Sequence, residues 1–130
     1  MPEIQGVNHV ALTVTDVEKS LAWYEKVLGV QKIMEDKNAD YARAVTIVGT
    51  LIIGFTSHAS TPPGDTFSEF RIGLDHVGFG CADKSTVEEW AAHLDSVGVS
   101  HSGVMDSGYG FHVNFRDPDN NALEFFAMPS

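Results

Sequence analysis

The stretch "GVNHVALTV", residues 6–14, returns as "GLDHVGFGC" at residues 73–81, and this repeat decides how the chain folds. The copies lie 67 residues apart, and each places a polar residue and then a histidine, His9 or His76, inside an apolar run. Further residues match at the same offset: Asp16 with Asp83 and Trp23 with Trp90. Self-similarity over two copies predicts a domain with pseudo-twofold symmetry rather than a many-repeat solenoid.

Each copy opens a unit that reads strand, helix and three further strands. Apolar residues at helical spacing follow the first strand, from Val17 to Leu28 and from Val87 to Leu94, and Asp16 and Asp83 are suitable N-caps before them. The later strands are predicted at "QKIMED", "YARAVTIV" and "LIIGFTS" in the first unit, and at "SGVMD", "YGFHVNF" and "ALEFFAM" in the second. The pattern predicts an α+β fold of two tandem β-α-β-β-β modules.

The two modules are expected to cover about residues 5–58 and 73–128 of a single domain that spans residues 1–130. Residues 59–72 contain two adjacent prolines and several polar residues, which is typical of a connector. This connector would let the modules pair within one chain or between two chains. The segment "RDPDNN", residues 116–121, is rich in turn formers and predicts a hairpin into the last strand.

Composition and charge restrict the classes of partner. The 130 residues include 18 Asp and Glu against 8 Lys and Arg, a net charge of -10 that repels phosphate backbones and anionic lipids. Cys81 is the single cysteine, and no stretch has the pattern of a leader or a membrane span. We therefore expect a soluble cytoplasmic protein that binds neither nucleic acid nor membrane. An acidic surface could also favour a cationic ligand.

The histidine faces of the two repeated strands carry small neighbours. Ala11 and Thr13 share a face with His9, and two glycines share a face with His76, whereas the opposite faces are apolar. A lone histidine in a strand is more often a hydrogen-bonded core residue, but two at matching positions favour a site. Two sheets that turn such faces toward each other would enclose a small-molecule cavity.

Glu124 interrupts the otherwise apolar strand "ALEFFAM". Burying an ionised carboxylate alone is costly, so it needs a cation, a hydrogen-bond network or solvent. His9, His76 and Glu124 together form the two-histidine, one-carboxylate set that holds a divalent transition metal and leaves coordination positions open. The alternative is that Glu124 reaches solvent at a sheet edge.

These motifs, together with "FRDPDNNALEFF", resemble the vicinal oxygen chelate superfamily, which contains glyoxalase I, bleomycin and fosfomycin resistance proteins and extradiol dioxygenases. The resemblance covers nearly the whole chain. It implies a cupped eight-stranded mixed sheet with the helices outside, a divalent metal (Zn, Ni, Co, Mn or Fe), a small-molecule substrate and often a homodimer. The superfamily's ligand positions lie on the first and last strands of each module, which implies His9, His76 and Glu124 as metal ligands.

The last strand of the first module, "LIIGFTSH", departs from the superfamily pattern. A glutamate ligand would fall near Ile53 or Phe55, neither of which binds metal. Strand alternation points His58 to the other face unless a bulge intervenes. The resemblance therefore implies three protein ligands with water in the remaining positions, and the lost carboxylate argues against strict glyoxalase I activity.

The leading functional hypothesis is a metal-dependent lyase or isomerase of the glyoxalase type, acting on a substrate that chelates the metal through adjacent oxygens. Candidate general bases are Glu124, His112 and Tyr109, although the alternation of its strand would also allow His112 to face solvent. Two alternatives remain open. One is an Fe(II) extradiol-type dioxygenase; the other is a metal-free, bleomycin-resistance-like binding protein with a groove lined by Trp23, Tyr41, Phe55 and Tyr109.

Arg43 lies in the strand "YARAVTIV" and is a candidate to bind a substrate carboxylate or phosphate. Tyr41 and Phe55 are expected to line the same substrate pocket. The alternative for Arg43 is an edge position from which its charged group reaches solvent.

Overall fold

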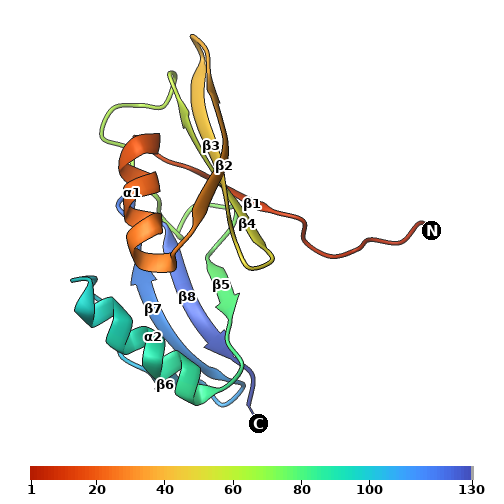
Figure 1. The fold of residues 1–130 in the computed structure, drawn as a ribbon, viewed down its shortest axis with the longest axis vertical. Coiled ribbons are helices and arrows are strands. Elements are labelled where there is room, and N and C mark those ends of the chain that lie inside the picture. Colours follow the sequence, from red (N-terminus) through yellow and green to blue (C-terminus); the bar gives the residue numbers. More distant parts are fainter. Residues whose placement is uncertain (130) are drawn as a thin grey trace. The chain divides into compact units, whose positions relative to one another are not determined.

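The computed structural model describes residues 1–129 and divides into two compact units, one from Met1 to Asp65 and the other beginning at Thr66. Each unit contains one helix and one four-stranded mixed sheet (Figure 1). Both units run in the order strand, helix, strand, strand, strand. The predicted α+β fold of two β-α-β-β-β modules is confirmed.

The first unit has the strand order β1-β4-β3-β2, with β1 parallel to β4 and the other pairs antiparallel. Its elements are β1 (Val10–Thr13), α1 (Val17–Leu28), β2 (Gln31–Lys37), β3 (Tyr41–Val48) and β4 (Leu51–His58). The second unit has the equivalent order β5-β8-β7-β6, with β5 parallel to β8. Its elements are β5 (Val77–Gly80), α2 (Lys84–Ser96), β6 (Met105–Asp106), β7 (Phe111–Arg116) and β8 (Ala122–Ala127).

Both helices begin where the sequence places an aspartate cap. The Asp16 carboxylate accepts the backbone N–H of Lys19 at 3.2 Å, and Asp83 accepts the N–H of Thr86 at 2.8 Å. These bonds satisfy backbone donors that the first helical turn leaves free. At the other end α1 stops at Gly29, whose φ of 72° is the left-handed conformation that glycine adopts readily.

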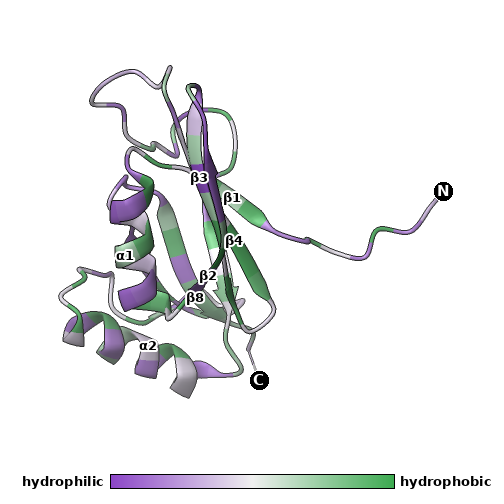
Figure 2. Ribbon diagram, turned by 45° about the horizontal axis from the view of Figure 1, so that its top comes forward, coloured by the Kyte–Doolittle hydropathy of each residue, from purple (hydrophilic) through white to green (hydrophobic). Residues whose placement is uncertain are grey.

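One face of each sheet packs against the helix of its own unit. In the first unit the rings of Tyr24 and Phe55 lie 4.5 Å apart, and in the second Trp90 stacks on Phe125 at 4.2 Å. Figure 2 shows hydrophobic and hydrophilic residues interleaved along both helices, as expected for helices with one buried side. The predicted apolar faces are confirmed, because Leu12 and Val14 are buried while Ala11 and Thr13 are exposed.

The turn between β7 and β8 is the predicted hairpin and is held by its own polar side chains. The Asp117 carboxylate accepts the backbone N–H groups of Asp119 and Asn121 at 2.9 and 2.8 Å. Asn120 has a φ of 67°, which asparagine tolerates better than most residues. Its side-chain amide donates to the carbonyl of Phe67 at 3.1 Å, so the turn also ties down the start of the second unit.

Three strands differ from the sequence prediction. The strand predicted at "SGVMD" is reduced to the two residues of β6, and both repeated strands begin one residue after their histidine. Neither helix of residues 1–129 is long and apolar enough to span a bilayer.

Replacing Asp83 by alanine is expected to lower the stability of the protein at neutral pH by removing the cap of α2. Its hydrogen bonds from the backbone N–H and hydroxyl of Thr86 lower the pKa of Asp83. A lowered folded-state pKa means that the stabilisation is present above the unfolded-state pKa and disappears as pH falls through the folded-state pKa. Urea unfolding of wild type and Asp83→Ala should therefore show a difference at pH 7 that narrows as the pH is lowered toward 3.

Candidate metal and substrate site

The second unit gathers its polar side chains on the sheet face opposite α2. In the strand register Glu124 pairs with Gly78 on one side and with Asn114 on the other, and His112 pairs with Phe126. Because directly paired residues share a face, Glu124, Asn114, His112 and Phe126 all project from the face that α2 does not cover. His112 therefore lies on the same face of the sheet as Glu124.

Glu124 is the centre of this group. One carboxylate oxygen lies 3.4 Å from Nε2 of His76, and the other lies 3.7 Å from Nδ1 of His112. The Glu124 side chain is 18% exposed and that of His112 is 12% exposed, while His76 is 47% exposed. Two predicted metal ligands and one predicted base thus meet within the second unit.

The aspartate before His76 holds the imidazole ring. Nδ1 of His76 lies 2.7 Å from the Asp75 carboxylate, and this hydrogen bond is the main cause that raises the pKa of His76. Burial opposes the shift and the negative charge of Glu124 supports it. An ionised carboxylate can only accept, so Nδ1 carries the proton and Nε2, the nitrogen facing Glu124, is left as the available ligand atom.

The first unit repeats this arrangement with an amide in place of the acid. Nδ1 of His9 lies 2.7 Å from Oδ1 of Asn8. With that oxygen as acceptor, His9 also presents Nε2 as its free nitrogen. The polar residue before each histidine, noticed in the sequence only as part of the repeat, is thus the partner that fixes the ring.

Gly78 leaves room for the Glu124 carboxylate. A Cβ atom built on Gly78 would lie 3.1 Å from Oε1 of Glu124 and 3.4 Å from its Cγ. The small residues seen in the sequence on the His76 face therefore provide a space that the carboxylate occupies. By contrast, a Cβ on Gly80, two residues further along β5, would meet nothing within 4 Å.

A hollow of about 330 Å³ opens over the His76, His112 and Glu124 group. Tyr109, Glu69 and Arg116 also line it. Arg116 forms a bidentate ion pair with Glu69 at 2.9 and 3.1 Å, which lowers the pKa of Glu69. Since the hollow also holds Asp75 and Glu124, its lining offers more carboxylates than guanidinium groups.

The strand register corrects the prediction for the missing fourth ligand. Ala11 in the first repeated strand corresponds to Gly78 in the second. Gly78 pairs with Glu124 and Ala11 pairs with Gly54. Gly54, rather than Ile53 or Phe55, is therefore the counterpart of Glu124 in the first unit. His58 has the same alternation as Gly54 and lies on the same face, with no bulge needed. It is four residues further along β4, about 14 Å away at the usual rise per residue.

Phe55 does not line a substrate pocket. Its side chain is 0% exposed and packs on Tyr24 between the sheet and α1. This position also removes one of the four residues assigned to the groove of a metal-free binding protein. The error came from the strand pairing, because a shift of one residue moves a side chain to the opposite face.

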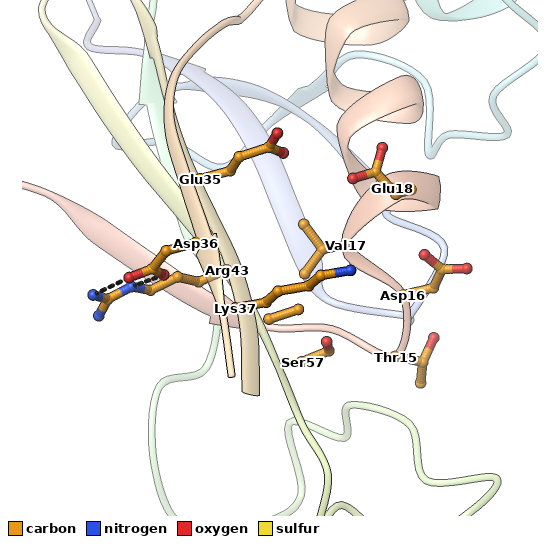
Figure 3. A pocket seen from close by; sticks show the side chains of 10 residues that line it. Thr15, Asp16, Val17, Glu18, Glu35, Asp36, Lys37, Arg43 and Ser57 are labelled. Carbon is orange, nitrogen blue, oxygen red and sulfur yellow. Dashed lines mark hydrogen bonds and ion pairs between the residues drawn. The ribbon is translucent and has the colours of Figure 1, made fainter. Parts of the chain in front are cut away.

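Arg43 and Tyr41 lie on the other face of the same sheet, away from α1. Arg43 makes a bidentate ion pair with Asp36 at 2.7 and 3.0 Å, and its guanidinium lies 5.1 Å from the centre of the Tyr41 ring. Figure 3 shows this pair pointing away from α1, while Glu35 and Lys37 point toward it. The neighbouring Asp36 also raises the pKa of Arg43, so the arginine is charged but already paired.

The helix side of this sheet has a second hollow, of about 450 Å³ (Figure 3). Glu18 and Asp16 from the start of α1 face Glu35 and Lys37 from β2 across it. This hollow lies on the α1 side of the sheet, whereas strand alternation places His9 on the opposite side.

The proposed donors, two imidazoles and one carboxylate, are of the types that bind divalent metals. The structure does not bring them together as a complete cluster. Among residues 1–129, no three His, Cys, Asp or Glu side chains lie close enough together to hold an ion. The second unit supplies His76 and Glu124 within 3.4 Å, and the first supplies His9.

A family model matches residues 6–125, nearly the whole chain, and it is that of the Glyoxalase/Bleomycin resistance protein/Dioxygenase superfamily. The chain belongs to this superfamily. The resemblance drawn from the repeated histidine motifs is therefore confirmed. The family contains several reactions, so membership alone leaves the reaction open.

Individual relatives agree with the superfamily assignment. The chain is 27% identical over 123 residues to the metallothiol transferase FosB of Staphylococcus saprophyticus, covering 93% of this chain and 76% of that protein. A crystal structure of a superfamily domain from Frankia sp. superposes with a TM-score of 0.89 at 28% identity, covering 98% and 95% of the two chains. The fosfomycin resistance protein FosX of Listeria monocytogenes, solved with Mn(II) and a dihydroxypropylphosphonic acid, shares the fold with a TM-score of 0.72 at 21% identity, covering 98% of this chain and 93% of FosX.

Truncating Asp75 to alanine is expected to weaken binding of a divalent metal by about 10- to 100-fold, because His76 loses the partner that fixes its ring. Asp75→Asn should lose less, since its amide oxygen can accept the same hydrogen bond that Asn8 accepts from His9. Zinc affinity measured by competition with a coloured chelator tests both variants. Equal affinities for wild type and Asp75→Ala would show that the contact does not support the ligand.

Proposed function

We propose that the protein is a divalent-metal-dependent enzyme of the glyoxalase type, a lyase or isomerase whose substrate chelates the metal through two adjacent oxygens. His9, His76 and Glu124 would hold the ion. The observation that carries the proposal is the group around Glu124, whose carboxylate lies between two imidazoles while Asp75 turns the free nitrogen of His76 toward it.

A bound divalent ion would act as a Lewis acid that stabilises an oxyanion or enolate on the substrate. The protein would supply the base. Nδ1 of His112 lies 3.0 Å from Oδ1 of Asn114, and with that oxygen as acceptor Nε2 is the basic nitrogen. His112 is thereby prepared to take a proton from a carbon next to the chelating oxygens. Glu124 and Tyr109 remain candidates for the same role.

The charges of the hollow favour a neutral or cationic substrate over a phosphonate. Arg116 is paired with Glu69, and Arg43 on the other sheet is paired with Asp36. A strongly anionic substrate would have to break one of these pairs or rely on the metal alone. This argues against carrying the fosfomycin-related activity of FosX over to this chain.

A ring-cleaving dioxygenase is the second candidate. The same ligand set suits ferrous iron and oxygen, and the superfamily description includes dioxygenases. The aromatic side chains of Tyr109 and Phe126 near Glu124 are compatible with such a substrate. The two candidates differ in what they consume, because only the dioxygenase uses O₂.

Proton exchange tests the leading proposal without knowledge of the natural substrate. Protein loaded in turn with Zn, Ni, Co or Mn is incubated in D₂O with 2-hydroxyacetophenone, whose carbonyl and hydroxyl oxygens are adjacent. We expect deuterium incorporation at the carbon that bears the hydroxyl group, next to the carbonyl. This exchange should be at least about 100-fold faster than with metal alone and should be lost in His112→Ala. Exchange no faster than in the Glu124→Gln variant would contradict the proposal, and O₂ consumption with catechol by the iron-loaded protein would favour the dioxygenase.

A further inference from the structure

We propose that Tyr109, Phe126 and His112 form an aromatic wall that binds the flat apolar end of the substrate. The substrate class would then be a compound with an aromatic or similarly flat group directly beside its two chelating oxygens. This inference rests on the proposed function, because it takes the chelating end to lie on a metal at Glu124.

The three rings form a row. Tyr109 and Phe126 have ring centres 6.2 Å apart with planes inclined by 25°, and Phe126 and His112 have centres 6.4 Å apart with planes inclined by 24°. Such spacings and near-parallel planes lie within the range of offset-stacked aromatic pairs. Phe126 is therefore in aromatic contact with Tyr109 and His112, two residues that line the hollow.

The aromatic wall stands beside the proposed metal ligand. Phe126 follows Glu124 by two residues on β8, so both side chains project from the same face. Two residues of extended strand separate their Cα atoms by roughly 7 Å. That distance matches a small substrate whose ring is attached directly to the chelating group.

The Phe126 ring occupies space that a glycine leaves open. A Cβ on Gly110 would overlap the Phe126 ring and would lie 2.7 Å from the backbone carbonyl oxygen of Ala127. Gly110, the residue before β7, therefore leaves the space that the ring occupies. Tyr109, which lines the hollow, is 69% exposed. Most of its aromatic ring is therefore not buried by other residues of the second unit.

The electrostatics of the hollow point to an uncharged group at this end. Of the described residues that line it, Arg116 is the one guanidinium, and Glu69 already holds it. Glu69 and Asp75 would repel a second anionic group on the substrate. Apolar contact with the rings is the interaction that remains for the non-chelating end.

Two hydroxamates that differ only in their substituent test the wall. Acetohydroxamate and benzohydroxamate both chelate a divalent ion through adjacent oxygens, and only the second carries a ring. We titrate each into zinc-loaded full-length protein by calorimetry, for wild type, Tyr109→Ala and Phe126→Leu. Phe111→Leu is the matched control, since Phe111 takes the opposite face of β7 from His112. Metal content and circular dichroism are checked for each variant.

We expect wild type and Phe111→Leu to bind benzohydroxamate about tenfold more tightly than acetohydroxamate. That preference, the ratio of the two affinities, should fall to about threefold or less in Tyr109→Ala and Phe126→Leu. Equal binding of the two probes to wild type would overturn the aromatic wall while leaving the chelate mechanism intact. Binding of neither probe to zinc-loaded protein would contradict the proposed function itself, and the inference with it.

Discussion

Replacing Glu124 by glutamine should lower the affinity of the protein for Zn²⁺ by more than about 100-fold, because losing a proposed metal ligand should cost more than losing a residue that only hydrogen-bonds to a ligand, which costs about 10- to 100-fold. Glutamine keeps the volume of the side chain but removes its charge. The change leaves Nε2 of His76, 3.4 Å away, without an anionic neighbour on that side. Competition with a coloured zinc chelator measures the effect directly.

Two controls separate loss of the ligand from general disturbance. Glu88→Gln removes a carboxylate that pairs with Lys84 at 3.6 Å on α2, and it should leave zinc affinity unchanged. Gly78→Val should weaken zinc binding by pressing on Glu124, whereas Gly80→Val should not, because a Cβ there meets nothing. Zinc binding by Glu124→Gln as tight as that of wild type would remove Glu124 from the metal site.

Gly110→Ala should be the most destabilising small substitution in the second unit, lowering the free energy of unfolding by about 2–3 kcal/mol. The added methyl group would meet the Phe126 ring and the Ala127 carbonyl oxygen, and the carbonyl belongs to the paired strand β8 and cannot move freely. In an unconstrained strand the same change would be neutral or slightly stabilising. The difference is measured from urea unfolding curves of wild type and Gly110→Ala, fitted with one common dependence of the free energy of unfolding on urea concentration.

Gly80→Ala is the matched control for this measurement, since it adds the same methyl group to the same sheet in open space. Its free energy of unfolding should stay within about 0.5 kcal/mol of wild type. If Gly110→Ala proved as stable as Gly80→Ala, the close packing of Gly110 beneath Phe126 would be disproved.

The repeat and the residue alternation were sufficient to predict most of the fold. Apolar spacing located both helices, and an aspartate before each run located their caps, because these features are local to the sequence. The alternation of His9 with Ala11 and Thr13 also identified the face that carries no helix. What the sequence could not supply was the pairing of β4 with β1, and this is why Gly54 was missed and Phe55 was misplaced.

The site was predicted in its residue types but not in its contacts. His76 and Glu124 were identified because a histidine and a carboxylate stood in apolar strands, and the structure brings them together. The roles of Asp75 and Asn114 depend on how the side chains of neighbouring residues are oriented, and the role of Gly110 depends on the Phe126 ring from β8, so residue type alone does not reveal them. The one available signal was the polar residue before each histidine, repeated at residues 8 and 75.

The central proposal is that His9, His76 and Glu124 are the ligands of one divalent ion. Plasma mass spectrometry on untagged protein, purified without chelator, tests it on wild type and on His9→Ala, His76→Ala and Glu124→Ala. The account predicts close to one divalent ion per chain in wild type and loss of that ion in all three variants. An ion retained in His9→Ala would contradict the role of His9 as a ligand, and a wild type that binds no ion even after zinc, nickel, cobalt, manganese and iron are added back would contradict the chelate mechanism.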